Sequence, residues 1–388
     1  MKRLSNQQKL RQMRRARRAI AKRSVKIAYI RLVHAQLERD IVALRAARLS
    51  LPSPAVSIGT YRTPAGNVVP ETRLLAPNDL SLGNFESTMA FIEELRWSAF
   101  VKIQFRGKQA LAATKRRYVA DLTPVETLTI DAALVVAAEF DRIRRVREFK
   151  PKIEDVLWAP WLRVCLRALG FYEIVDGSGE STAADQDDNE TAHLRFVRLA
   201  SGDKLDPQAA DDLLTRLQTA AGDAPERQEL YASLIEAIGN AQEHAYRDCP
   251  PYGLVPRIGM WWAGGAYDLA ENRLHLSVYD QGKGIPATLP SNEWFKPLLE
   301  RLGLSTDADQ IEAALEYGRT SAANPAGRGN GLWRMVKLAE SRPKSYVHIF
   351  SGRGHVSCNS DGQLTKRQLP VPFCGTLIHW NIFTGEAA

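Results

Sequence analysis

The chain has 388 residues, of which 45% are hydrophobic and 25% charged, a composition typical of a globular protein with two or three domains. It contains no run of about 18 apolar residues, which argues against a membrane-spanning helix, and its basic N-terminus is not followed by the apolar core of a signal peptide, which favours the cytoplasm. The net charge is +8, but residues 1–48 hold 15 Lys/Arg and 2 Asp/Glu, so the rest of the chain carries −5.

Residues 1–50 form a basic arm that we expect to be a long helix. They lack Pro and Gly and are rich in Arg, Ala, Leu and Gln, which are common in helices, and apolar residues recur near helical spacing. Three interpretations stay open. The arm is a solvated helical extension or coiled coil, or it binds nucleic acid or another polyanion, or it is a helix for a membrane surface or a partner.

Residues 51–77 hold five prolines and two glycines, which predicts a linker or a loosely structured hairpin. In residues 78–176, helix-like and strand-like stretches alternate, which favours a small α/β module. We expect helices at 85–100, 130–145 and 158–169, and strands at 117–122 and 171–175. Residues 177–192 are acidic and lack large apolar side chains, which predicts a flexible linker and a domain boundary.

The stretch YVADLTPVETLTIDAALVVAAEF (118–140) resembles the STAS family of anti-sigma-factor antagonists. In that family a strand ends in Asp, and Asp-Ser-Ser-Gly opens a helix after a short loop. The matching place here is Asp131-Ala132-Ala133-Leu134. The resemblance implies a binding module, whereas the absence of the phosphorylatable serine argues against a phospho-switch in this loop. An unrelated small α/β domain is the alternative.

Residues 193–388 form the second predicted domain. The segment 207–220 is expected to be a helix capped by Asp206, and 229–246 a second helix that carries the candidate site. Strands are expected at 194–199, 258–263, 274–280 and 377–382, and further helices at 307–317 and 333–340. The strands at 258–263 and 274–280 are expected to pair antiparallel across a loop containing Gly264-Gly265.

The helix at 229–246 carries Glu236, Asn240 and His244 at four-residue steps. Four residues advance a helix by about 40°, so the three polar side chains lie along one row. A separate apolar stripe gives the helix a face for packing. A carboxylate and an amide beside such a stripe are suited to holding a metal-bound substrate, although an ordinary surface helix has the same pattern.

Three later segments contain glycines. Asp280 ends a strand whose alternate residues are apolar, so its carboxylate is expected to point toward the core and to need a hydrogen-bond donor. Gly282 and Gly284 follow and let the backbone approach a ligand closely. Backbone N–H groups of the loop Gly327-Arg328-Gly329-Asn330-Gly331, which runs into a helix, suit phosphates. The last of the three is Gly375-Thr376, the fourth segment when the helix at 229–246 is counted as the first.

Together these segments resemble the GHKL ATPase superfamily (gyrase, Hsp90, histidine kinase and MutL) over about residues 225–384. Glu236 and Asn240 resemble its N box, and Asp280, Gly282 and Gly284 resemble its G1 box. Gly327, Gly329 and Gly331 resemble its G2 box, and Gly375 with Thr376 resembles its glycine-threonine pair. Asn240 to Tyr246 most resembles the anti-sigma-factor serine kinase branch. The implied fold class is α/β (α+β): a C-terminal α/β sandwich with a mixed, mainly antiparallel sheet, after a small STAS-like module and a basic helix.

The resemblance also implies ATP and Mg²⁺ as cofactors and assigns roles to residues. Asn240 would bind Mg²⁺, and Glu236 would be the general base for water or an acceptor hydroxyl. Asp280 would accept from the adenine amino group, with Thr376 helping to hold adenine. Gly282 and Gly284 would pass beside the nucleotide, and Gly327, Gly329 and Gly331 would contact phosphates. Residues 286–326 occupy the place of the ATP lid. We expect His244 to be a packed or surface histidine.

These roles imply a magnesium-dependent regulatory or signalling protein that hydrolyses ATP or transfers its γ-phosphate to a protein partner. The alternative is an ATP-gated scaffold that recruits nucleic acid or a protein partner through residues 1–48. A toxin–antitoxin or phage-defence component also fits the combination of modules, although no residue argues for it. A protein partner is expected, residues 1–48 are a candidate for binding nucleic acid, and a homodimer is compatible with the sequence.

Overall fold

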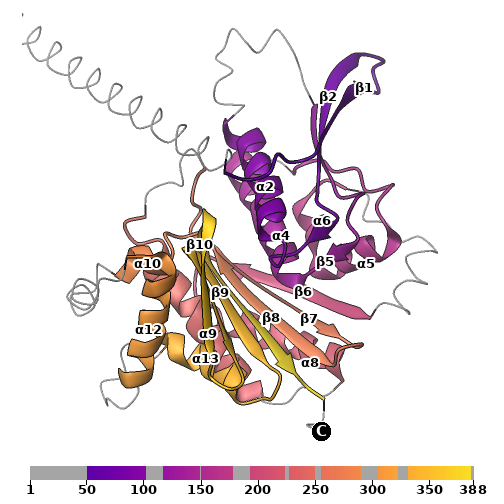
Figure 1. Ribbon diagram of the computed structural model, residues 1–388. Helices are drawn as coiled ribbons and strands as arrows, with labels where there is room; N and C mark the ends of the chain where they lie inside the picture. The colour runs from indigo at the N-terminus through magenta and orange to yellow at the C-terminus, as the bar shows by residue number, and fades with distance from the viewer. Residues whose placement is uncertain are drawn as a thin grey trace, which may run out of the picture.

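The computed structural model of the chain describes residues 50–101, 117–148, 150–177, 193–222, 227–249, 255–289, 305–321 and 331–385. These residues form a mixed α/β fold built around one five-stranded sheet (Figure 1). All but the last residue of the predicted basic arm and all but the first residue of the predicted acidic linker lie outside the described residues. Within the described part of the chain, no helix has both the length and the apolar character needed to cross a membrane.

The five-stranded sheet has the order β6-β7-β8-β10-β9, and each neighbouring pair is antiparallel. In β8, the alternation of Leu274, Leu276 and Val278 places these apolar side chains on one face. The antiparallel pairing predicted for the strands at 258–263 and 274–280 is confirmed by the pairing of β7 with β8. The strands are β6 (Leu194–Gly202), β7 (Trp261–Asp268), β8 (Arg273–Asp280), β9 (Tyr346–Asn359) and β10 (Leu364–Phe383).

One face of this sheet packs against four helices through a single hydrophobic core. Asp206 caps the first of them, as predicted, because its Oδ1 accepts hydrogen bonds from the backbone N–H groups of Gln208 (3.0 Å) and Ala209 (3.1 Å). The expected helix at 229–246 is α-helical only to Asn240 and then continues as a π-helical turn, η3 (Ala241–Ala245). The four helices are α8 (Pro207–Ala221), α9 (Arg227–Asn240), α12 (Asp307–Ser321) and α13 (Gly331–Glu340).

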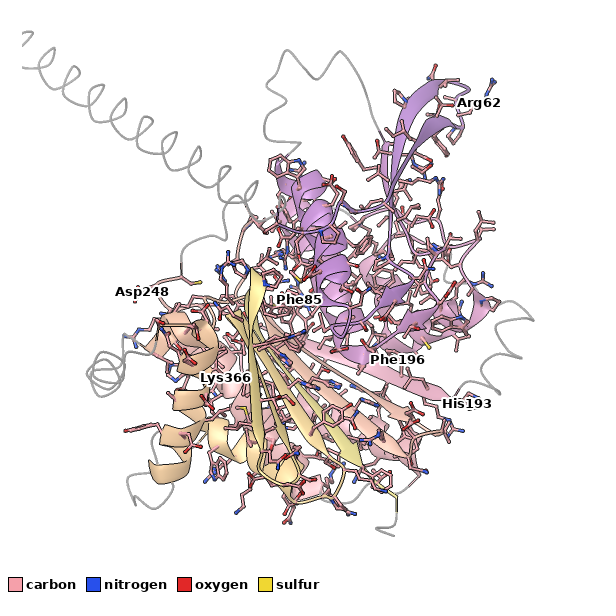
Figure 2. All side chains as sticks on the ribbon, viewed as in Figure 1. Arg62, Phe85, His193, Phe196, Asp248 and Lys366 are labelled. Carbon is pink, nitrogen blue, oxygen red and sulfur yellow. The ribbon has the colours of Figure 1, made fainter. Side chains whose placement is uncertain are left out.

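The opposite face is covered by helices from the N-terminal half of the chain, which share a second core with the sheet (Figure 1). Phe85, which is labelled in Figure 2, lies at the start of the first of these helices. It stacks on Phe350 of β9 with ring centroids 6.2 Å apart. The N-terminal helices and the sheet are therefore joined by continuous apolar packing. They are α2 (Phe85–Arg96), which runs on into the π-helical η1 (Trp97–Val101), α4 (Ile130–Arg147), α5 (Pro160–Leu169) and α6 (Phe171–Ile174).

Two small sheets lie beside these helices. The first has the order β1-β2-β4, with β1 and β2 antiparallel and β2 and β4 parallel. Residues 51–77 therefore include the hairpin that was one of the two alternatives for this segment. A two-stranded sheet pairs β3 with β5 in parallel. The strands are β1 (Val56–Arg62), β2 (Val68–Leu75), β3 (Asp79–Leu80), β4 (Arg117–Asp121) and β5 (Thr127–Leu128).

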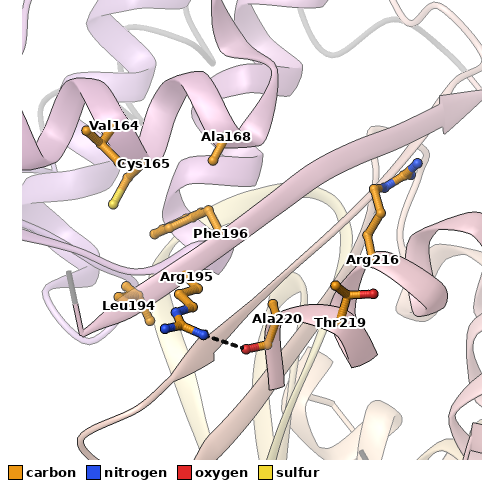
Figure 3. Close-up of a pocket in the computed structure, with 9 residues that line it drawn as sticks. All are labelled: Val164, Cys165, Ala168, Leu194, Arg195, Phe196, Arg216, Thr219 and Ala220. Atoms are coloured by element: carbon orange, nitrogen blue, oxygen red, sulfur yellow. Dashed lines mark hydrogen bonds between the residues drawn. The ribbon is translucent and has the colours of Figure 1, made fainter. Parts of the chain in front are cut away.

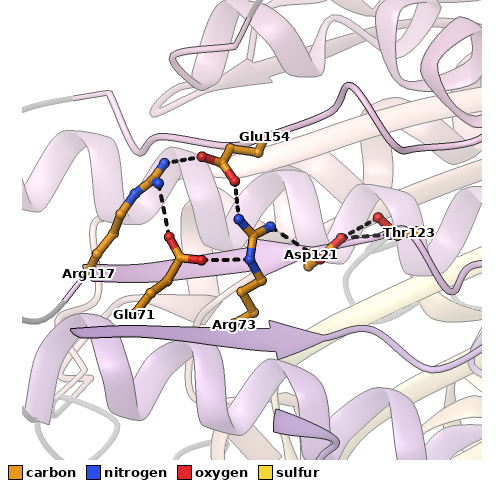
Figure 4. Close-up of polar contacts among 6 residues, drawn as sticks. All are labelled: Glu71, Arg73, Arg117, Asp121, Thr123 and Glu154. Carbon is orange, nitrogen blue, oxygen red and sulfur yellow. Dashed lines mark hydrogen bonds and ion pairs between the residues drawn. The ribbon is translucent and has the colours of Figure 1, made fainter. Parts of the chain in front are cut away.

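A half-buried network of ion pairs joins β2 and β4 of the three-stranded sheet (Figure 4). Arg73 of β2 donates to Glu71 (2.7 Å) and to Glu154, and Arg117 of β4 donates to Glu71 (2.9 Å) and to Glu154 (2.5 Å). The two arginines keep the pKa of Glu154 below its usual value, against the opposing effect of partial burial. The carboxylates thereby connect two strands with the segment before α5.

Two sequence predictions were wrong, and one strand was missed. Gly264 and Gly265 lie inside β7, not in a loop, and a Cβ at Gly264 would lie 3.3 Å from Leu134 of α4, so the glycine lets this helix pack closely. The expected strand at 171–175 is the short helix α6, since Gly170 (φ +86°) ends α5 and the buried pair Phe171 and Ile174 has helical spacing. β9 was not predicted at all.

Candidate functional site

Helix α9 and η3 position the three polar residues expected to mark the site. Glu236 and Asn240 are half-buried, whereas His244 is exposed. The α-helix ends at Asn240, so His244 belongs to the π-helical turn, and its Nε2 lies 4.0 Å from a carboxylate oxygen of Glu243. Such turns often occur at functional sites. The exposure of His244 agrees with the expectation of a surface histidine.

Glu236 lies directly against Gly331, the first residue of α13. A Cβ at residue 331 would lie 2.6 Å from the Cδ atom of Glu236 and even closer to its Oε1. Glycine at this position therefore provides the space that the carboxylate fills. Because α13 packs along α9, the helix that carries Glu236 contacts the end of the predicted phosphate loop.

Asp280 lies at the end of β8, with 7% of its surface exposed. Its Oδ1 accepts a hydrogen bond from the backbone N–H of Gly282 at 2.7 Å. Burial raises the pKa of this carboxyl to about 7, although the backbone N–H groups of Gly282 and Thr376 and the charge of Arg257 oppose the rise. The expected buried carboxylate is therefore present, and it titrates near neutral pH.

The loop after Asp280 is pressed against the end of η3. A Cβ at Gly282 would lie 2.5 Å from the carbonyl oxygen of Ala245, and the backbone N–H of Lys283 donates to that oxygen at 2.9 Å. Gly284 has φ +84°, which favours glycine. This loop leads into the short helix α10 (Ile285–Thr288). The loop after Asp280 therefore contacts the end of the helix expected at 229–246.

Gly375 and Thr376 of β10 complete this end of the sheet. Thr376 pairs with Asp280 in the β8–β10 register. Gly375 has φ +92°, and a Cβ there would lie 2.7 Å from the carbonyl carbon of Asp280 and overlap its oxygen. The Gly375-Thr376 pair thus lies beside Asp280, and only glycine fits at residue 375.

Replacing Gly375 with alanine is expected to destabilise the fold by about 2 to 4 kcal/mol, because backbone strain and overlap with Asp280 add. Urea denaturation checks this value. Gly66→Ala is the matched control, since Gly66 also has a positive φ (+82°) but no atom lies within 4 Å of its added Cβ. Equal losses in the two variants would show that overlap with Asp280 contributes nothing.

Ser351 of β9 was missed by the sequence analysis. Its buried hydroxyl accepts from the backbone N–H of Ile285 (2.7 Å), donates to the carbonyl of Gly375 (3.2 Å) and lies 3.0 Å from the hydroxyl of Thr376. It therefore ties the loop after Asp280 to the Gly375-Thr376 pair. No motif in the sequence marked it, because the strand that carries it was not expected.

Gln281 is a second residue that the sequence did not mark. Its backbone N–H donates to the hydroxyl of Tyr246 at 2.8 Å, and its carbonyl accepts from Arg257 at 2.5 Å. Its buried side chain donates to Glu139 of α4 at 3.3 Å. The residue next to Asp280 is therefore bonded to a helix of the N-terminal half.

Glu139 belongs to a fully buried charge network between α2, α4 and the sheet. It accepts from Arg96 at 2.5 Å and from Arg142, and Arg96 also donates to Glu93 at 2.5 Å. The two arginines lower the pKa of Glu139 although burial acts in the opposite direction. This ionic cluster carries the contact between α4 and Gln281.

Gly327, Arg328 and Gly329 lie outside the described residues, as does much of the segment expected to be a lid. Of the predicted phosphate loop, the structure describes Gly331. Two cavities, of about 370 and 340 Å³, lie elsewhere and include none of the predicted site residues. The larger is lined by α5, β6 and α8 and has an apolar wall containing Phe196 (Figure 3).

Comparison of the chain with family models finds no match, and no curated protein matches it. The site is therefore interpreted from its own residues. Two contacts define it: Glu236 meets Gly331 where α9 and α13 pack, and Asp280, Gly282 and Gly375 meet at the end of β8, against the end of η3.

Proposed function

We propose that residues 193–388 form a magnesium-dependent ATP-binding domain of the GHKL type, which hydrolyses ATP or transfers its γ-phosphate to a protein partner. The observation that carries this proposal is the contact of Glu236 with Gly331. It places a carboxylate at the start of the helix behind the proposed phosphate loop, where a general base would act on water or a hydroxyl.

The surroundings of Asp280 support adenine as the base. A buried carboxylate accepts a hydrogen bond from an exocyclic amino group with little competition from water. Its two backbone donors hold it in place, and the Gly282 and Gly375 backbones lie beside it. Asp280 is thus a preorganised acceptor at the edge of the proposed site.

Magnesium fits the donor available on α9. Mg²⁺ prefers oxygen ligands, keeps several waters and takes few ligands from the protein when phosphates are present. Asn240 supplies one amide oxygen, one helical turn after Glu236. When bound, the ion would neutralise charge on the phosphates, and the role of the chain is to orient it through Asn240.

Calorimetric titration of the full chain with ATP and with a non-hydrolysable analogue, with and without Mg²⁺, tests this function. We expect both nucleotides to bind in the micromolar to millimolar range and to bind more tightly with Mg²⁺, with phosphate release from ATP alone. Absence of binding at millimolar nucleotide would contradict the proposal. Binding without phosphate release or labelling of a partner would favour the ATP-gated scaffold.

A further inference from the structure

The cavity of about 340 Å³ lies between α4, the α5–α6 junction and β6, and it has no role in the function proposed above. Its volume suits a small organic molecule better than a single inorganic ion. Its lining is strongly charged, since it contains three arginines and two carboxylates. They are Arg144, Arg145 and Arg198, with Asp141 and Glu173.

Asp141 is buried and orients two of these arginines. Its Oδ1 accepts from Nε and Nη2 of Arg144 (3.0 and 2.6 Å), and its Oδ2 accepts from Nε of Arg145 (2.9 Å) and from the indole N–H of Trp262 (3.1 Å). Among the described residues, these are the bonds that Arg144 and Arg145 make. Each guanidinium has five N–H donors, so both keep donors for another acceptor.

The charges leave an excess of positive charge in the cavity. Asp141 balances only one of the two arginines that it orients. Arg198 pairs with Glu173, but their side chains are 56% and 57% exposed. An exposed pair contributes little stability, so Arg198 can exchange Glu173 for a ligand at low cost.

We propose that this cavity binds the phosphate group of a small phosphate monoester. Each guanidinium is a planar fork of donors that matches a phosphate, Asp141 orients two of them, and charge-assisted bonds of this kind are strong. Once a ligand replaces Glu173 at Arg198, three arginines face Asp141 alone, an excess of two positive charges. A monoester is close to a dianion at neutral pH, so it balances this excess better than a single carboxylate. The remaining volume accommodates the organic group of the ester.

Phenyl phosphate is a suitable probe for the full chain, with benzyl alcohol as its neutral counterpart. Calorimetry should show saturable binding of phenyl phosphate and none of benzyl alcohol. Arg145→Gln should weaken binding about tenfold or more, as expected for a lost charged hydrogen bond. Arg198→Gln, at a more exposed position that tolerates substitution, should also weaken it by several fold.

Matched controls separate this site from others. Arg147→Gln on α4 and Arg195→Gln on β6 remove arginines from the same elements but outside the cavity lining, and both should bind normally. The proposal is overturned if phenyl phosphate does not bind at millimolar concentration, or if Arg145→Gln and Arg198→Gln bind like the unmodified chain.

Discussion

Replacing Glu236 with glutamine is expected to slow phosphate release by about 10²- to 10⁴-fold, the usual contribution of a general base. Glutamine has nearly the same shape, so it fills the space beside Gly331 and leaves α9 and α13 packed. Nucleotide affinity should therefore change little. Phosphate release at saturating ATP, together with calorimetry, measures the two effects separately.

Glu243→Gln is the matched control for this experiment. Glu243 is seven residues further along the same helical segment, but it is exposed and points away from the cores. It should keep full activity. If Glu236→Gln retained normal phosphate release, Glu236 would not be the base, whereas loss of nucleotide binding in this variant would show that it acts on binding.

Asp280→Asn is expected to weaken ATP binding by about 10- to 100-fold, because a hydrogen bond to a charged acceptor is lost. The amide oxygen of asparagine still accepts from Gly282, so the loop should keep its position. Calorimetric titration with ATP measures the change. Undiminished affinity would remove Asp280 from the proposed adenine site.

The same substitution should stabilise the ligand-free protein at alkaline pH. The folded pKa of Asp280, about 7, lies above its ordinary value of 3.8, so the native state holds a proton that the unfolded chain has released between these two values. The free energy of unfolding therefore falls as pH rises from about 4 to about 7 and is constant above. Each pH unit corresponds to 1.36 kcal/mol, so the loss is at most about 4 kcal/mol.

Unfolding in urea at pH 5 and pH 8 measures this effect. The advantage of Asp280→Asn over the unmodified chain should grow from pH 5 to pH 8. ATP affinity of the unmodified chain should fall as pH drops through 7, since the amino group prefers the ionised carboxylate. An advantage that is the same at both pH values would mean that Asp280 does not titrate in this range.

Local patterns in the sequence identified the elements that depend on neighbouring residues. The alternation in β8, the Asp206 cap and the apolar stripe of α9 each depend on spacing within one element, and the structure contains all three. The burial of Asp280 also followed from its place in the alternating row. These features are local, so no knowledge of the rest of the chain was needed.

The tertiary structure alone placed Glu236 beside Gly331, because about one hundred residues separate them and only the packing of α13 on α9 joins them. It also placed Ser351, whose partners lie on β10 and α10, and Gln281, whose side chain bonds to α4. Gly264 was expected in a loop but lies in β7 under α4, because the sequence does not distinguish a glycine in a turn from one that leaves room for a packed helix. Sequence shows which residues suit a site, and packing decides which of them meet, since contacts between distant segments depend on the whole core.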